Sequence, residues 1–205
     1  MWFPRMHHPI RAGTPSSDLG DAIGAGRRDA AHRMGFLRNR GDDDGDGTRY
    51  RMHEKLFAIG DDYWIENDDG ERRFKVDGKA LRARDTFVLK DSSGDDLFKV
   101  QEKKLHIHDT MKIERDGDTL ATVKKALITP LRDRFDIEIE DGDDLEAKGN
   151  IVDHEYKIER DGDHVAEVSK RWFRIRDTYG IEIAPGQEDA LILAVTVCID
   201  EMSHD

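Results

Sequence analysis

An exact internal repeat constrains the fold of this chain more than any other feature. The stretch Lys112–Asp118 recurs unchanged as Lys157–Asp163, 45 positions further on. Both copies read Lys-Ile-Glu-Arg-Asp-Gly-Asp, in which the Asp-Gly pair favours a tight turn between two strands. Looser copies of this hairpin unit surround Asp68–Gly70, Ser93–Asp95 and Asp141–Asp143. Consecutive copies of one hairpin predict an antiparallel all-β fold.

Alternating apolar residues support this prediction. Phe135, Ile137 and Ile139 are separated by charged residues, and Tyr179–Ile183 follows a similar pattern. Such a period of two buries one face of a strand and leaves the other face in water. The pattern predicts about twelve strands between Arg51 and Ala184, one of them over Val165–Arg171, and so many strands are expected to close into a barrel.

The C-terminal segment follows a different pattern. Ala190–Ile199 is apolar at every position except Thr196, and Pro185, Glu188 and Asp189 precede or open it in places that favour a helix start. A helix that is apolar all round must be enclosed. A barrel of about twelve strands has room for a helix about 10 Å across, so a central helix is predicted at about residues 187–202.

These features resemble a known family. The stretch Arg51–Glu66, the Phe74–Gly78 that follows, and the closing apolar segment are similar to LURP-one-related proteins, which are relatives of the tubby C-terminal domain and of phospholipid scramblases. The resemblance covers the predicted barrel domain, residues 49–205. It implies a twelve-stranded barrel around a C-terminal helix. It says less about activity. Tubby domains bind phosphoinositides and scramblases act on membranes, but these activities extend to this chain only by analogy of fold.

Charge and composition exclude several classes of protein. The seven arginines of residues 1–48 balance seven aspartates, so the net charge of −12 falls on the rest of the chain. Residues 1–48 are rich in Gly, Pro and Ser without an apolar period, which predicts a disordered leader. The acidic balance argues against nucleic acid as a partner. The ten-residue apolar run is too short for a transmembrane segment, and the single cysteine, Cys198, fits a cytoplasmic protein without disulfides.

The charges are expected to separate along the barrel. Acidic turns lie within the repeats, whereas basic residues lie one strand length further on, so alternate connections give an acidic end and a basic end. The basic end is the candidate site for lipid or other anions, and its members are Lys103, Lys104, Lys124, Lys125, Arg132, Arg134, Lys170, Arg171, Arg174 and Arg176. The helix is expected to begin at the acidic end and to emerge near the basic end with Asp200, Glu201 and Asp205.

No recognised catalytic motif is present, and no cofactor or metal site is predicted. Asp42–Gly47 matches the first half of a calcium-binding loop, but the twelfth position is His53 instead of glutamate. His106 and His108 share one face of a strand, and two imidazoles rarely suffice for a metal. Cys198 is interpreted as a small core residue. The chain is therefore predicted to be non-enzymatic.

Three functions remain open at this level. The leading hypothesis is a barrel domain that binds anionic phospholipid or phosphoinositide peripherally through its basic end, where each Lys or Arg contributes about 1 kcal/mol. The first alternative is a protein-interaction or scaffolding module without a lipid role. The second alternative is an enzyme that acts at the exposed acidic end.

Overall fold

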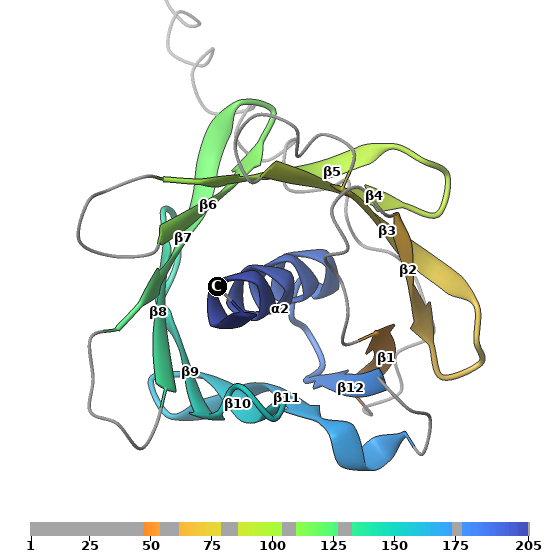
Figure 1. Cartoon of the computed structure of the whole chain (residues 1–205). Coiled ribbons are helices and arrows are strands. Elements are labelled where there is room, and N and C mark those ends of the chain that lie inside the picture. Colours follow the sequence, from red (N-terminus) through yellow and green to blue (C-terminus); the bar gives the residue numbers. More distant parts are fainter. Residues whose placement is uncertain are drawn as a thin grey trace, which may run out of the picture. The chain divides into compact units, whose positions relative to one another are not determined.

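The computed structural model describes residues 47–53, 62–78, 86–103, 110–126, 133–173 and 178–204. Within these ranges twelve antiparallel strands form a closed barrel around one helix (Figure 1). The all-β fold class, the closure and the enclosed helix are therefore confirmed. The predicted leader lies outside the described residues apart from Gly47 and Thr48, and its disorder stays a prediction.

Each strand of the barrel pairs with its neighbours in the sequence, and the first pairs with the last. The strands are β1 (Thr48–His53), β2 (Tyr63–Asn67), β3 (Arg72–Asp77), β4 (Thr86–Asp91), β5 (Asp96–Glu102), β6 (Thr110–Arg115), β7 (Asp118–Lys125), β8 (Asp133–Ile139), β9 (Leu145–Asn150), β10 (Glu155–Arg160), β11 (Asp163–Ser169) and β12 (Thr178–Ile183). Closure runs from Thr48 opposite Ile183 to His53 opposite Thr178.

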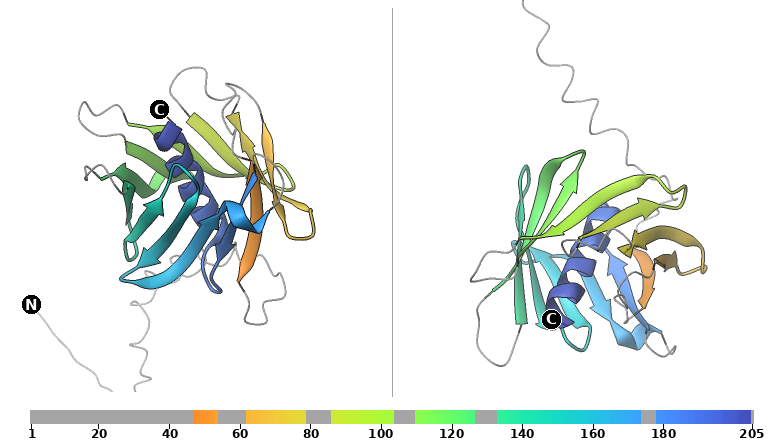
Figure 2. Two further views of the ribbon diagram at one scale, coloured as in Figure 1. Left: turned by 60° about the horizontal axis from the view of Figure 1, so that its bottom comes forward. Right: turned by 45° about the horizontal axis from the view of Figure 1, so that its top comes forward.

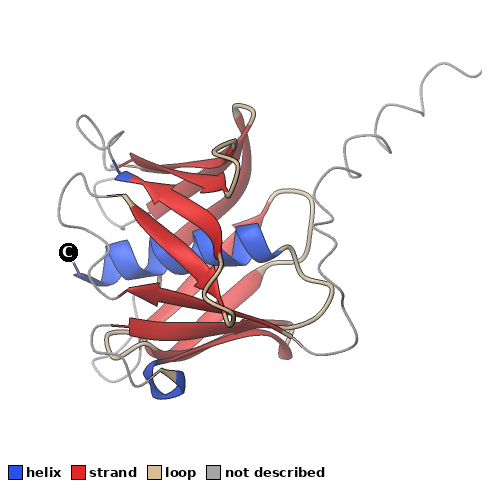
Figure 3. Cartoon of the chain, turned by 90° about the vertical axis from the view of Figure 1, so that its right-hand side faces the viewer, coloured by secondary structure: helices blue, strands red, loops and turns tan. Residues whose placement is uncertain are grey.

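The inward faces of the strands form the core, as the alternation predicts. Phe135 and Ile137 on β8, and Tyr179, Ile181 and Ile183 on β12, are all buried. The helix α2 (Asp189–His204) fills the lumen along the barrel axis (Figure 3). Its apolar residues are buried on every side, which explains why the segment shows no amphipathic period.

The hairpin turns gather at one end of the barrel. The turns that join β2 to β3, β4 to β5, β6 to β7, β8 to β9 and β10 to β11 lie at the end where α2 begins, and the turn from β9 to β10 lies at the end where α2 finishes (Figure 2). Asp116 and Asp161, the two equivalent repeat positions, both adopt the left-handed backbone of a tight turn, with φ of 54° and 51°.

One predicted strand begins and ends two residues earlier than expected. The strand predicted over Val165–Arg171 ends at Ser169, and Lys170–Trp172 forms the short 3₁₀ helix η2. Alternation could not reveal this change, because a single 3₁₀ turn interrupts the pattern too briefly.

Candidate functional site

The described members of the basic end lie where the topology predicts, but their surroundings differ. Lys103 follows β5 and is exposed, and Lys124 on β7 faces outward and pairs with Glu138. Lys125 donates from Nζ to the carbonyl oxygen of Met202 at 3.1 Å, near the end of α2. The remaining positions Lys104, Arg132, Arg174 and Arg176 lie outside the described residues.

Lys170 and Arg171 occupy a tightly held turn. The Glu155 carboxylate accepts hydrogen bonds from Ser169 Oγ at 3.0 Å and from the backbone N–H of Lys170 at 3.2 Å. Ser169 Oγ in turn accepts from the backbone N–H of Arg171 at 3.1 Å. The Arg171 side chain is 82% exposed, with Nε 3.4 Å from Glu155 Oε2. The backbone is thus fixed while the guanidinium extends into solvent.

The residues after this turn lie against the outer wall. A Cβ on Gly180 would come within 2.7 Å of both Trp172 and Phe173, so only glycine leaves room for these two rings over β12. Arg49 on β1 lies 5.5 Å from the Trp172 ring, and Arg51 lies 5.8 Å from the Phe173 ring. These cation–π contacts join the segment to the seam between β1 and β12.

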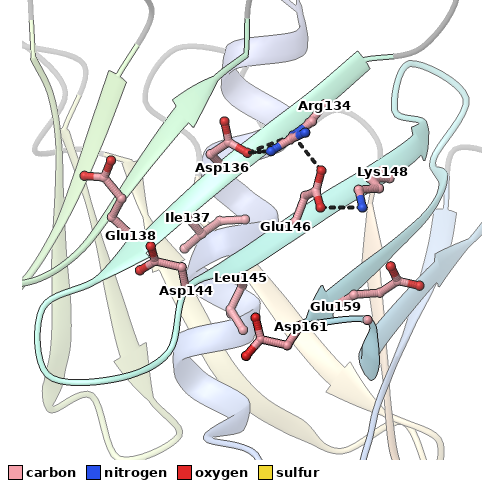
Figure 4. Close-up of a pocket in the computed structure, with 11 residues that line it drawn as sticks. Arg134, Asp136, Ile137, Glu138, Asp144, Leu145, Glu146, Lys148, Glu159 and Asp161 are labelled. Atoms are coloured by element: carbon pink, nitrogen blue, oxygen red, sulfur yellow. Dashed lines mark hydrogen bonds and ion pairs between the residues drawn. The ribbon is translucent and has the colours of Figure 1, made fainter.

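A surface hollow of about 550 Å³ lies on the outer wall of β8, β9 and β10 (Figure 4). Six carboxylates line it, but the close-up shows that Arg134 joins two of them. Arg134 Nη2 lies 2.7 Å from Asp136 Oδ1, and Arg134 Nε lies 2.6 Å from Glu146 Oε1. Glu146 also pairs with Lys148. Arg134 therefore neutralises acidic neighbours, which weakens its case as an anion-binding residue.

A buried polar cluster occupies the lumen near the basic end. His154 and Asp200 are 1% and 2% exposed, and His154 Nε2 lies 3.0 Å from Asp200 Oδ1. Tyr179 donates from its hydroxyl to Asp200 Oδ2, and its ring lies 4.2 Å from the His154 ring between centroids. The expectation that Asp200 emerges at the basic end is therefore wrong: it faces the inner wall and has polar partners there.

Burial also changes the acidity of groups around the helix. Desolvation, followed by the charge of Asp200, raises the pKa of Tyr63, Tyr156 and Tyr179 well above the usual value. Burial raises the pKa of the Cys198 thiol, which agrees with its interpretation as a core residue. A thiol held protonated in this way is a poor nucleophile.

Two further findings concern metals and membranes. Within the residues that the structure describes, no group of three His, Cys, Asp or Glu side chains could hold a metal ion. His106, His108 and the aspartates of Asp42–Asp46 lie outside those ranges, so the expectations for them stay untested. No helix in the described ranges is long and apolar enough to cross a membrane.

A comparison with known protein families agrees with this architecture. The family model described as LURP-one-related matches residues 48–200, which include all twelve strands and most of α2. The chain belongs to the LURP-one-related family. The resemblance seen in the sequence is thereby confirmed.

A solved structure has a similar fold. An X-ray structure of a protein from Arabidopsis thaliana matches with a TM-score of 0.57 and 18% sequence identity, over 77% of this chain and 91% of that one. At this identity the likeness concerns the fold alone. No curated protein gives a significant match.

Proposed function

We propose that this LURP-one-related domain is a non-enzymatic module that binds anionic phospholipid peripherally, at a cytoplasmic membrane surface, through its basic end. The observation that carries the proposal is the fixed turn of Lys170 and Arg171, which holds an exposed guanidinium beyond the end of β11. A cation on an ordered backbone loses less conformational entropy on binding than one on a flexible loop.

An exposed apolar side chain accompanies these cations. Val152 lies in the turn between β9 and β10. It is the large apolar residue that is mainly exposed within the described ranges, with 54% of its surface accessible. Glu155 pairs with Ser169 across β10 and β11, so the Val152 turn and the Lys170 turn extend from the same end of neighbouring strands. Cations beside an apolar tip suit the interface of an anionic bilayer, where charge attracts and the apolar group inserts.

The distribution of charge supports one orientation at a membrane. The acidic turns lie at the opposite end of the barrel, including those at Asp68 and Asp69, at Asp116, and at Asp161. Although the net charge is −12, an anionic surface repels the acidic end more strongly than the basic end. The resulting dipole turns the basic end toward the membrane.

Liposome flotation of the full chain tests this proposal. Neutral phosphatidylcholine vesicles are compared with vesicles that contain phosphatidylserine, at low and at physiological salt. Binding to the anionic vesicles is expected to weaken with salt, because ions screen exposed charges. The double variant Lys170→Glu with Arg171→Glu is expected to lose most of the binding, and Val152→Glu part of it.

A matched control separates a local site from net charge. The double variant Lys99→Glu with Lys157→Glu changes the net charge equally, but both positions lie on the outer wall, on β5 and β10. It should retain most of the binding. Absence of binding at either salt, or an equal loss in the control, would refute the proposal.

One observation favours a protein-interaction role as the second candidate. Arg72 on β3 lies 5.2 Å from the Trp64 ring on β2. Together with the two arginine–aromatic contacts at Trp172 and Phe173, this contact gives the wall of β1, β2, β3 and β12 the residue types enriched in binding hot spots. If flotation fails, loss of a captured protein on Trp64→Ala, compared with Trp172→Ala, would support this role.

A further inference from the structure

Three lysines from adjacent strands converge on the outer wall of β5, β6 and β7. The backbone N–H of Lys103 donates to the Thr110 carbonyl oxygen at 2.7 Å, and Thr110 pairs with Lys124. Lys112 lies two residues further along β6 and shares the outward face. Figure 1 shows the three strands as neighbours in the barrel wall. Register therefore places Lys103, Lys112 and Lys124 on one outward face, on three consecutive strands or their ends.

Two of these ammonium groups are closer than their charges favour. The neighbouring Lys112 side chain is the first cause of a lowered pKa of Lys103, and desolvation and the charge of Lys124 act in the same direction. Lys112 Nζ is held by Thr119 Oγ1 at 3.0 Å. Among the described residues no carboxylate lies within ion-pair distance of Lys103. Like charges at such range repel each other unless an anion lies between them.

The neighbouring acids only partly offset this charge. Glu138 pairs with Lys124, and Glu140 acts on Lys103 from a longer distance. Both carboxylates belong to β8 or the turn after it, on one side of the three lysines. The side toward β5 is left to Lys103, because Lys99, further along that strand, is opposite Glu114 and stays outside the cluster. An anion that approaches there meets several cations at once.

We propose that Lys103, Lys112 and Lys124 form a binding site for a phosphate monoester. A monoester carries a charge of about −1.5 to −2 and three strong acceptor oxygens, which matches three converging ammonium groups. A phosphodiester carries one charge and offers fewer free oxygens. The inference rests on the proposed function and gives it a preferred headgroup, one with a terminal phosphate.

The test compares two anionic lipids and one soluble ion with the full chain. Vesicles that contain phosphatidic acid present a phosphate monoester, whereas phosphatidylserine vesicles of equal surface charge present a phosphodiester. Inorganic phosphate, with sodium chloride at equal ionic strength as its control, is added in thermal unfolding experiments, because a ligand of the native state raises the melting temperature.

The decisive variant is Lys112→Gln, and Lys99→Gln is its matched control on the same wall. Lys112→Gln is expected to weaken binding to phosphatidic acid vesicles about tenfold, since one charge-assisted contact is lost. Binding to phosphatidylserine should stay unchanged, because Lys170 and Arg171 lie elsewhere at the basic end. Glu138→Gln should strengthen phosphatidic acid binding, as it releases Lys124.

The outcomes separate the two proposals. Selective loss on phosphatidic acid supports a lipid headgroup, and a Lys112-dependent rise of melting temperature with inorganic phosphate supports a soluble phosphate compound. If Lys112→Gln equals the Lys99→Gln control in both assays, the phosphate site is refuted while phosphatidylserine binding still supports the basic end. If no vesicle binds, the proposed function fails and the inorganic phosphate assay alone decides on the site.

Discussion

The two ends of α2 are both tied to the barrel through carboxylates, in opposite surroundings. At the start of the helix, Tyr50 donates from its hydroxyl to Asp189 Oδ2 at 2.6 Å, and Arg115 pairs with Glu188, both in part-buried positions. Near its end, Asp200 is fully enclosed with His154 and Tyr179. Water can replace a partner at the first end. It cannot do so at the second, so the inner cluster should be much less tolerant of substitution.

The largest effect is expected from His154→Ala. This change takes away the His154 imidazole 3.0 Å from the buried Asp200 carboxylate and opens a cavity, and the two effects together cost about 3–5 kcal/mol of the free energy of unfolding. Urea denaturation measures it, with exposed His164→Ala as control. A loss no greater than that of the control would contradict the special position of this end.

Alkaline titration sharpens the same comparison. All four tyrosines of the chain have a raised pKa, through burial first and then through Asp189 for Tyr50 or Asp200 for the other three. Because its pKa is raised in the folded state, each tyrosine stabilises the protein below the unfolded pKa of 10.0. This stabilisation is lost as the pH rises above 10.0, by up to about 1.4 kcal/mol per pH unit for each group. Phenolate absorbance should therefore appear with unfolding, in one steep step. A gradual rise near pH 10 would contradict it.

The smallest effects are expected from a matched pair of substitutions, one at each end of α2. Tyr50→Phe removes one part-buried hydrogen bond and should cost about 1 kcal/mol, because water reaches Asp189. Tyr179→Phe makes the same chemical change beside Asp200 and should cost about 2–3 kcal/mol, because the lost donor of a buried charge is not replaced. Equal losses of unfolding free energy would show that the two ends do not differ.

Local patterns predicted most of the fold. Alternation in Phe135–Ile139 and the Asp-Gly turns of the two repeats identify hairpins, and an apolar segment at 190–199 can only be enclosed. These features depend on neighbours in the sequence. The short 3₁₀ helix at Lys170–Trp172 could not be predicted, because the alternation of side chains does not show which backbone turn follows a strand.

The missed site residues depend on long-range register. His154 lies in a turn with a left-handed φ of 52°, and its partner Asp200 is 46 positions away on the helix. Asp200 ends an apolar run and is followed by Glu201, a pattern that predicts emergence at the basic end instead of burial. Lys112 sits inside a repeat and shows its proximity to Lys103 only once β5 and β6 are aligned.

The order of elements along the chain also decides when folding can finish. β1 joins β12 at Thr48 and Ile183, and the segment that fills the lumen comes after both. During synthesis, eleven strands leave the ribosome before the twelfth closes the ring, with their apolar faces still unfilled. Contacts so distant in sequence form slowly, and open strand edges meanwhile invite other chains. The nascent chain is therefore exposed to aggregation until its last helix is available.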